Sequence, residues 1–250
     1  NFNRISKSAF FKKNKSNIFI EKIKLPEILF ITSFPPRECG IATYSEDLLK
    51  ALNKKFQQTF SLTVCPLESE FEQHTYDTTP QYILNTNIQK SFVKLAFQIN
   101  KNSNIKMVVI QHEFGFFANC ENDFQYLLNT ITKPLILVFH TVLPRPDSLL
   151  RLKVQEMCSA VDDVVIMTKT ALKILKTDYE ISPAKITVIP HGTHLVPHLD
   201  KAVLKRNYEF SNKTILSTFG LLSKGKSIET TLNALPKVIA VYPNILFLII

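Results

Sequence analysis

The sequence predicts an α/β fold built on a parallel β-sheet, and two patterns lead to this prediction. Short apolar segments typical of buried strands recur along the 250 residues, and segments with helical spacing of apolar residues lie between them. Such alternation places helices on both faces of a parallel sheet. A polar, proline-containing stretch interrupts the pattern before it starts again, which predicts a second lobe of the same kind.

Each strand is predicted from a short apolar run. In order, the runs of the first domain cover residues 27–32, 60–65, 81–84, 106–112, 134–140, 163–168 and 185–190. Apolar residues three and four apart predict helices beginning near residues 41, 88, 124, 148 and 172, the fourth of them capped by Asp147 or Ser148. A strand at 214–219, a helix face from 228 to 239 and an apolar run at 245–250 begin the second lobe.

These elements divide the chain into four parts. Residues 1–24 form a basic tail, 25–190 the first domain, 191–212 a linker, and 213–250 the first β-α-β unit of a second domain. The first residue is not Met, and no turn follows the last apolar run. We therefore expect a piece of a longer protein.

The tail holds most of the positive charge. The chain carries net +9, and the tail contains seven basic residues and one acidic residue, so the folded body is not strongly basic. This argues against a nucleic-acid partner. The tail is interpreted either as a solvated disordered segment or as a contact for anionic lipid.

No secretory signal and no run of transmembrane length is present, and the four cysteines form no CxxC pair. Scattered cysteines of this kind indicate a reducing compartment. We expect a cytoplasmic protein, with peripheral contact at the inner face of the membrane as the alternative that the tail leaves open.

The corner between the first strand and the first helix is the strongest candidate for a ligand site. The apolar run ends at Pro35 and Pro36, Gly40 lies in the turn, and helical spacing begins at residue 41. Thr43 and Glu46 fit a capping box, which would leave backbone N–H groups of the helix end facing outward, toward an anion such as a phosphate. A simple strand-to-helix turn is the competing interpretation.

Polar residues follow three of the predicted strands. Arg37 precedes Gly40, His112 and Glu113 follow the fourth run, and His140 ends the fifth. Because the carboxyl ends of parallel strands share one edge of a sheet, these residues are expected to converge on a ligand crevice. The competing interpretation of His140 and His112 is a core histidine bonded to the backbone.

Other chemistries find less support. The spacing of His191, His194 and His198 suits metal ligands on a helix, but Gly192 and Pro197 disrupt that helix and no cysteine or carboxylate lies nearby in sequence. We therefore predict no metal and no cofactor. A GxSxG elbow is also absent from the sequence, so a hydrolase triad is not supported.

The segment Gly220–Ser227 matches the P-loop pattern GxxxxGK[ST] and lies between a predicted strand and a helix. In a P-loop NTPase, Lys226 would meet the β- and γ-phosphates and Ser227 would bind Mg²⁺. Against this, a complete α/β domain precedes the motif. The P-loop NTPase is the alternative function.

From about residue 26 to the end, the chain resembles the family 4 (group 1) glycosyltransferases of GT-B fold. The resemblance rests on the order of several short segments: Pro35–Tyr44 (PPRECGIATY), His112–Phe116 (HEFGF), Phe139–Thr141 (FHT), Val188–Gly192 (VIPHG) and Phe219–Lys226 (FGLLSKGK). The resemblance implies two Rossmann-like lobes facing across a cleft. It also implies a nucleotide-diphosphate sugar as the donor, held mainly by the second lobe, and retaining transfer without a metal ion.

The resemblance also implies roles for individual residues. Gly40 would lie against the donor phosphates with Gly220, and Lys226 would neutralise the leaving diphosphate. His140 would face the acceptor and the transferred sugar as the catalytic residue. Arg37, His112 and Glu113 would lie on the side of the acceptor, a saccharide or a lipid-linked glycan.

The sequence departs from this family in two ways. Many members have Gly-Arg-Leu where this chain has Gly220-Leu221-Leu222, so half of the diphosphate clamp is missing and Lys224 is the candidate replacement. The Glu-x7-Glu segment that holds the donor sugar would lie beyond residue 250. We expect the 250 residues alone to show little turnover, and a non-catalytic nucleotide-binding fragment remains a further alternative.

Overall fold

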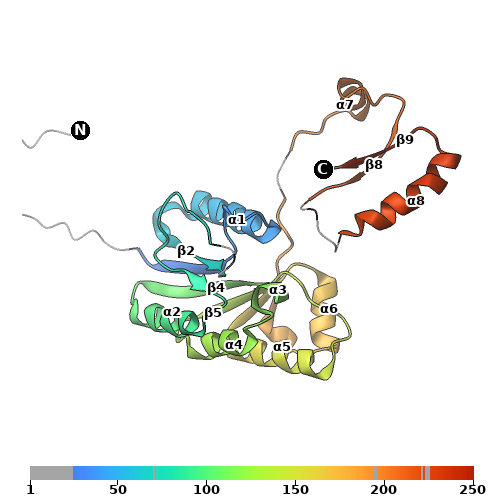
Figure 1. Ribbon diagram of the computed structural model, residues 1–250. Coiled ribbons are helices and arrows are strands. Elements are labelled where there is room, and N and C mark those ends of the chain that lie inside the picture. Colours follow the sequence, from blue (N-terminus) through green and yellow to red (C-terminus); the bar gives the residue numbers. More distant parts are fainter. Residues whose placement is uncertain (1–24, 70, 72, 194–195, 221, 223–225) are drawn as a thin grey trace, which may run out of the picture.

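The computed structural model describes residues 25–69, 71, 73–193, 196–220, 222 and 226–250. Seven parallel strands form one sheet in the order β3-β2-β1-β4-β5-β6-β7, and two further parallel strands, β8 and β9, form a second sheet (Figure 1). The predicted fold class, an α/β protein with a Rossmann-like parallel sheet, is confirmed.

The strands of the first sheet follow the apolar runs of the sequence. Their bounds are β1 Glu27–Thr32, β2 Ser61–Glu68, β3 Leu84–Asn85, β4 Ile105–His112, β5 Leu135–Phe139, β6 Asp163–Ile166 and β7 Ile186–Val188. Strands β3 and β7, at the two edges of the sheet, are half as long as predicted, because they pair with β2 and β6 through only two and three residues. A strand buried on both faces needs apolar side chains at every position, which is why these runs do not alternate with polar residues.

The helices between the strands also occur where the apolar spacing predicts them. They are α1 Gly40–Phe56, α2 Gln89–Lys101, α4 Glu121–Thr130, α5 Ser148–Ala160 and α6 Lys169–Thr177, with 3₁₀ helices at Gln57–Thr59 and Pro183–Lys185. The predicted cap of α5 is confirmed, since the Asp147 carboxylate accepts from Leu150 N at 2.8 Å. A one-turn helix, α3 Phe114–Phe117, was not predicted because four residues are too few to show helical periodicity.

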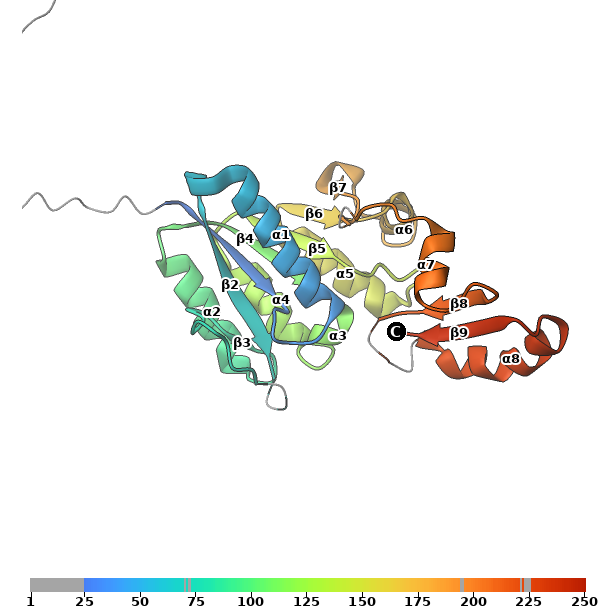
Figure 2. The ribbon, with the colours of Figure 1, turned by 90° about the horizontal axis from the view of Figure 1, so that it is seen from above.

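The two faces of the sheet are covered unequally (Figure 2). Helices α2, α4, α5 and α6 pack on one face around the larger apolar cluster, which includes Leu29 and Ile31 of β1. Helix α1 packs on the other face, over Phe30, Val109 and Val138. Because alternate strand residues point to opposite faces, the strands β1, β2, β4, β5 and β6 contribute to both clusters. The burial of their apolar side chains therefore also fixes the direction of the side chains at the strand ends.

The strand order reverses between β1 and β4. The chain runs outward from β1 to β2 and β3, returns through α2 to β4 beside β1, and then continues outward to β7. At such a reversal the connections leave the two central strands in opposite directions, which opens a crevice beyond their carboxyl ends.

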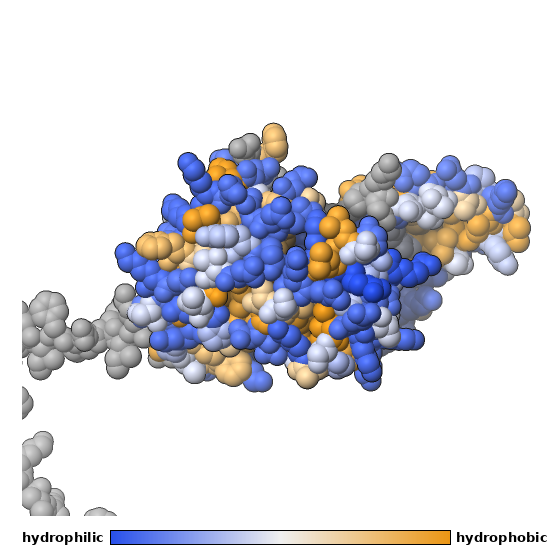
Figure 3. Space-filling view, turned by 90° about the horizontal axis from the view of Figure 1, so that it is seen from below, coloured by the Kyte–Doolittle hydropathy of each residue, from blue (hydrophilic) through white to orange (hydrophobic). Residues whose placement is uncertain are grey.

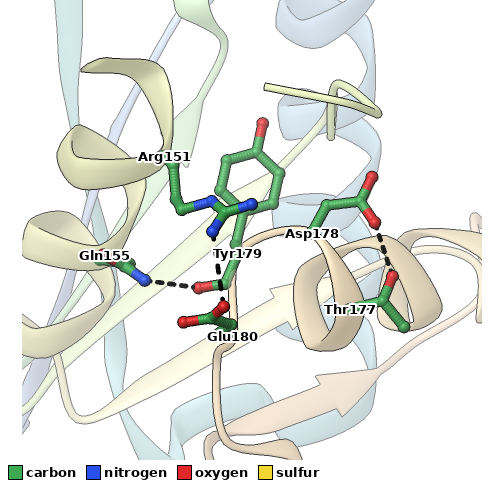
Figure 4. A network of polar contacts seen from close by, with 6 residues as sticks. All are labelled: Arg151, Gln155, Thr177, Asp178, Tyr179 and Glu180. Carbon is green, nitrogen blue, oxygen red and sulfur yellow. Dashed lines mark hydrogen bonds and ion pairs between the residues drawn. The ribbon is translucent and has the colours of Figure 1, made fainter. Parts of the chain in front are cut away.

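The loop after β5 is held in place by the end of α6 (Figure 4). Tyr179 is fully buried and its hydroxyl donates to Leu143 O at 2.8 Å, while Gln155 donates to Tyr179 O at 2.9 Å. Arg145 N donates to the Asp178 carboxylate at 2.9 Å. These bonds fix the course of residues 141–147 directly after the strand end at which His140 lies.

The second sheet belongs to the predicted second β-α-β unit, which consists of β8 Thr214–Thr218, α8 Ile228–Val241 and β9 Ile245–Ile249. The segment predicted as a linker, 191–212, contains a helix, α7 Lys201–Asn207. Asp200 caps the N-terminus of this helix, and its carboxylate accepts a hydrogen bond from Val203 N at 2.9 Å. The predicted basic tail, residues 1–24, lies outside the described residues.

Replacing Tyr179 with Phe should lower the free energy of unfolding by about 1 kcal/mol, because the Leu143 carbonyl loses its buried donor while the ring packing is kept. Urea unfolding of the wild type and the variant measures this difference. Tyr208→Phe, at a tyrosine that is 65% exposed, is the matched control and should change stability by less than about 0.5 kcal/mol. Equal effects of the two substitutions would show that the Tyr179 bond does not hold the loop.

Candidate functional site

The carboxyl ends of β1, β4 and β5 meet at the reversal of strand order. They bring together the loop 33–39, Glu113 and the pair His140-Thr141. Arg37, Gly40, Glu113 and His140, which are far apart in the sequence, thus belong to one edge of one sheet. The convergence expected of these four residues follows from the parallel pairing alone.

The corner at the start of α1 is built around a cysteine. The Cys39 thiol accepts from Ala42 N at 3.3 Å and lies 3.0 Å from the Ser33 hydroxyl, so Cys39 is the N-cap of α1. The predicted capping box of Thr43 and Glu46 is wrong, because the helix begins one turn earlier, at Gly40. Glu46 instead forms an ion pair with Lys50 one turn further along, at 2.8 Å.

Two backbone donors at this corner are left without a partner. Ala42 N and Thr43 N are bonded to the Cys39 side chain and carbonyl, whereas Gly40 N and Ile41 N have no acceptor within the part of the chain that the structure describes. A Cβ added to Gly40 would meet no atom within 4 Å, so the space in front of the helix end is open. Free N–H groups at the positive end of a 17-residue helix suit an anion.

His140 lies half-buried next to this helix end. Its Nε2 is 2.7 Å from Gln111 Oε1, its ring meets the edge of the Tyr44 ring at 5.0 Å between centroids, and its backbone N donates to His112 O at 3.0 Å. Burial, and to a smaller degree the charge of His191, lowers the pKa of His140 to about 4. With Gln111 Oε1 as the acceptor, Nε2 carries the proton and Nδ1 keeps its lone pair. The imidazole is therefore neutral at pH 7 and has one ring nitrogen left to accept a hydrogen bond.

The segment after β7 packs against the same corner. The His191 ring lies 4.9 Å from the Tyr44 ring between centroids, and its Nδ1 contacts Gly192 O at 2.7 Å. Tyr44 therefore has a histidine on either side, one from the end of β5 and one from the stretch that leads out of the first domain. His198 is exposed, and His194 lies outside the described residues. No three His, Cys, Asp or Glu side chains are grouped as metal ligands among the residues described.

Both carboxylate oxygens of Glu113 are hydrogen bonded. Oε1 accepts from Phe114 N at 3.1 Å as the cap of α3, and Oε2 accepts from the Thr141 hydroxyl at 2.5 Å. Glu113 thus joins the end of β4 to the residue after His140. The Arg37 guanidinium lies 5.2 Å from the centre of the Phe116 ring, which places the β1 loop against α3.

The side chain of His112 does not join the group formed by Arg37, Gly40, Glu113 and His140. Its side chain points to the opposite face of the sheet from His140 and is only 2% exposed, among the rings of Phe114, Phe117, Phe124 and Phe139 at 4.9–5.7 Å between centroids. Burial, with a smaller effect of His140, lowers its pKa to about 3. Adjacent strand residues face opposite sides, so Gln111 points to the site and His112 away from it.

The residues predicted in the second lobe lie near one another. Gly220 follows β8 with φ of +110°, and a Cβ added to it would lie 3.7 Å from Lys226 Nζ. Ser227 lies just before α8, with a left-handed backbone and no hydrogen bond from its hydroxyl to the helix. Lys224 lies outside the described residues.

Three of the residues that build the site were not predicted, namely Tyr44, Gln111 and Cys39. Gln111 is a polar residue inside an apolar run and is fully buried, and this exception to the pattern could have marked it. A small cavity of about 150 Å³ lies beside His140, lined by the loops after β5 and β6 and by α6. In the described part of the chain, no helix is both long and apolar enough to cross a bilayer.

Among solved structures, a glycosyltransferase from Rickettsia africae is similar, with 15% identity, a TM-score of 0.56, and coverage of 91% of this chain and 68% of that one. A UDP-N-acetylglucosamine 2-epimerase shows 12% identity and a TM-score of 0.53, with 90% of this chain and 63% of that one covered. An α-glucosyltransferase in complex with UDP and a 13-mer DNA has 12% identity, a TM-score of 0.45, and coverage of 89% and 56%.

This chain thus spans 56–68% of the length of these three proteins. Comparison with protein-family models gives no match. Comparison with curated protein sequences gives no match either. The similarity to the first two structures agrees with a Rossmann-like fold of the kind found in GT-B glycosyltransferases and nucleotide-sugar enzymes.

The buried histidine should make stability depend on pH. Because the pKa of His112 falls from its ordinary value of 6.5 to about 3 on folding, the unfolded state takes up a proton first, and stability is lost as pH falls below about 6.5. His112→Phe removes this contribution. When the pH is lowered from 7 to 5, the unfolding free energy of the variant should therefore fall by about 2 kcal/mol less than the unfolding free energy of the wild type.

Urea unfolding at the two pH values measures this difference. His198→Phe, at an exposed histidine, is the control and should leave the pH dependence unchanged. A His112→Phe variant with the pH dependence of the wild type would show that His112 is protonated equally well in the folded and unfolded states.

Proposed function

We propose that the protein containing this chain is a retaining glycosyltransferase. It moves a sugar from a nucleotide-diphosphate sugar to a saccharide or lipid-linked acceptor, without a metal ion, in glycan biosynthesis. One observation carries this proposal. At the reversal of strand order, the free N–H groups of Gly40 and Ile41 lie at the same edge of the sheet as the neutral ring of His140. The similar structures include a glycosyltransferase and a UDP-sugar epimerase, which supports a nucleotide sugar as the substrate class.

The chemistry needs these parts. Breaking the bond between a sugar and a diphosphate develops negative charge on the leaving phosphate, which N–H groups at a helix end stabilise. His140 accepts a hydrogen bond from a sugar hydroxyl through Nδ1 and so positions the transferred sugar. The acceptor approaches along the side of Arg37 and Glu113, where Glu113 holds Thr141 in place.

In the second lobe, Lys226 neutralises the leaving diphosphate together with Lys224, and Gly220 allows the backbone to approach it. The proximity of Lys226 Nζ to the Gly220 backbone supports this division of roles. We further propose that the protein acts in the cytoplasm, where its basic tail contacts anionic lipid. The absence of a nucleic-acid partner stays a prediction from the low charge of the folded body.

His140→Ala should lower the transfer rate of the full-length protein about 100-fold or more while the fold is kept, because a positioned polar group is lost. The measurement is sugar transfer from a panel of nucleotide sugars in the presence of EDTA, with circular dichroism to check folding. His198→Ala is the control and should transfer at the wild-type rate. An unchanged rate of His140→Ala, or its unfolding, would return His140 to the role of a core histidine.

Lys226→Ala should weaken binding of the nucleoside diphosphate about 10- to 100-fold and leave binding of the matching nucleoside unchanged, because the ammonium acts on the diphosphate. Calorimetric titration of the full-length protein with UDP, GDP and ADP and their nucleosides measures the effect. Lys237→Ala, at an exposed lysine of α8, is the control and should bind like the wild type.

The GxxxxGK[ST] match favours a P-loop NTPase as a second candidate function, and Ser227→Ala separates the two. A P-loop needs the Ser227 hydroxyl on Mg²⁺, so its loss would abolish Mg²⁺-dependent diphosphate binding. In a glycosyltransferase the same variant binds nearly like the wild type, with or without Mg²⁺. The left-handed backbone of Ser227, outside α8, favours the glycosyltransferase, since a P-loop lysine and serine begin their helix.

A further inference from the structure

A cavity of about 490 Å³ opens between α4 and α5, beside α3, on the face of the sheet opposite to that of His140. Half of the side chains that form its walls are aromatic or aliphatic, among them Phe117, Phe124, Tyr126, Leu150 and Met157. Figure 3 views the molecule from this side, on which hydrophobic residues lie among hydrophilic ones. Cavities of this size and character hold organic ligands.

His112 supplies a polar group in the wall of this cavity. The residue is 98% buried, its Nδ1 is inaccessible and without a partner, and neither ring nitrogen is hydrogen bonded to any residue that the structure describes. Leaving a buried polar group unpaired costs about 1–3 kcal/mol. A phenylalanine at this position would pack among the four surrounding rings without an unpaired polar group. The presence of an imidazole here therefore indicates a polar partner that is not part of the described chain.

The charges at the mouth restrict what can enter. Glu121, Glu156 and Asp147 line the cavity and Lys153 is the one basic residue that does so in the described chain, already paired with Glu121 at 3.5 Å between α5 and α4. The excess of carboxylates repels phosphates and carboxylic acids. The apolar walls and their four aromatic side chains favour a ring system as the body of the ligand.

We propose that this cavity binds a neutral aromatic alcohol, whose ring system packs between α4 and α5 and whose hydroxyl forms a hydrogen bond with the imidazole of His112. A hydroxyl both donates and accepts, so it pairs with a neutral histidine in either tautomer. The site lies on the opposite face of the sheet from the group around Gly40 and His140 and goes beyond the proposed glycosyl transfer.

The test compares 2-naphthol with 2-methylnaphthalene, which has the same ring system and no oxygen to donate or accept a hydrogen bond. The chain lacks tryptophan, so the emission of the naphthalene probes can be followed without interference from the protein. We expect 2-naphthol to bind the full chain at one site, about tenfold tighter than 2-methylnaphthalene, as the loss of one buried hydrogen bond predicts.

His112→Phe is the decisive variant, because it keeps a flat ring among the four phenylalanines and removes both nitrogens. It should bind the two probes with equal affinity and remain folded by circular dichroism. Leu152→Phe, on the exposed side of α5 away from the cavity, is the control and should keep the tenfold preference.

A second variant, Leu150→Phe, narrows the cavity and should weaken the binding of both probes. Binding of neither probe to the wild type, equal binding of both, or a hydroxyl preference that survives in His112→Phe would each overturn the proposal. Failure of glycosyl transfer would leave it intact, since none of these measurements uses a nucleotide sugar.

Discussion

The parallel pairing of β1 and β4 is the constraint on which the rest of the structure depends. Parallel strands carry their connections across the faces of the sheet, so all their carboxyl ends lie at one edge. The reversal of order at this pair directs the two following chains apart and leaves the start of α1 unobstructed. The open space at Gly40 and the free N–H groups beside it are consequences of this topology.

Strand alternation places two histidines on opposite faces of the sheet. Gln111 and His140 point to the face under α1 and bond to each other, whereas His112 points to the face under α4 and α5 and lies among four phenylalanine rings. Burial lowers the pKa of both imidazoles, so both are neutral at pH 7. Neutral imidazoles favour recognition of hydroxyl groups over anions, and this property unites the proposed sugar contact with the proposed alcohol site.

The two lobes differ in how much of their surface they bury. Every buried residue among those described belongs to the first domain, and none of the described residues from 201 onward is buried. Apolar side chains such as Phe219, Leu232 and Tyr242 are accordingly exposed. A two-stranded sheet with one helix connecting its strands offers too little apolar surface to enclose a core, which is why the proposed donor chemistry is assigned to the full-length protein.

The sequence by itself determined the fold class, the order of strands and helices and the edge at which polar residues meet, because apolar periodicity and parallel topology are local and geometric. It also grouped Arg37, Gly40, His112, Glu113 and His140 at that edge, and was wrong about the side chain of His112. Only the tertiary structure decided which partners these residues have. Gln111 binds His140, a cysteine caps α1 in place of the predicted box, and His112 faces the other layer, since such contacts join segments that no spacing along the chain connects.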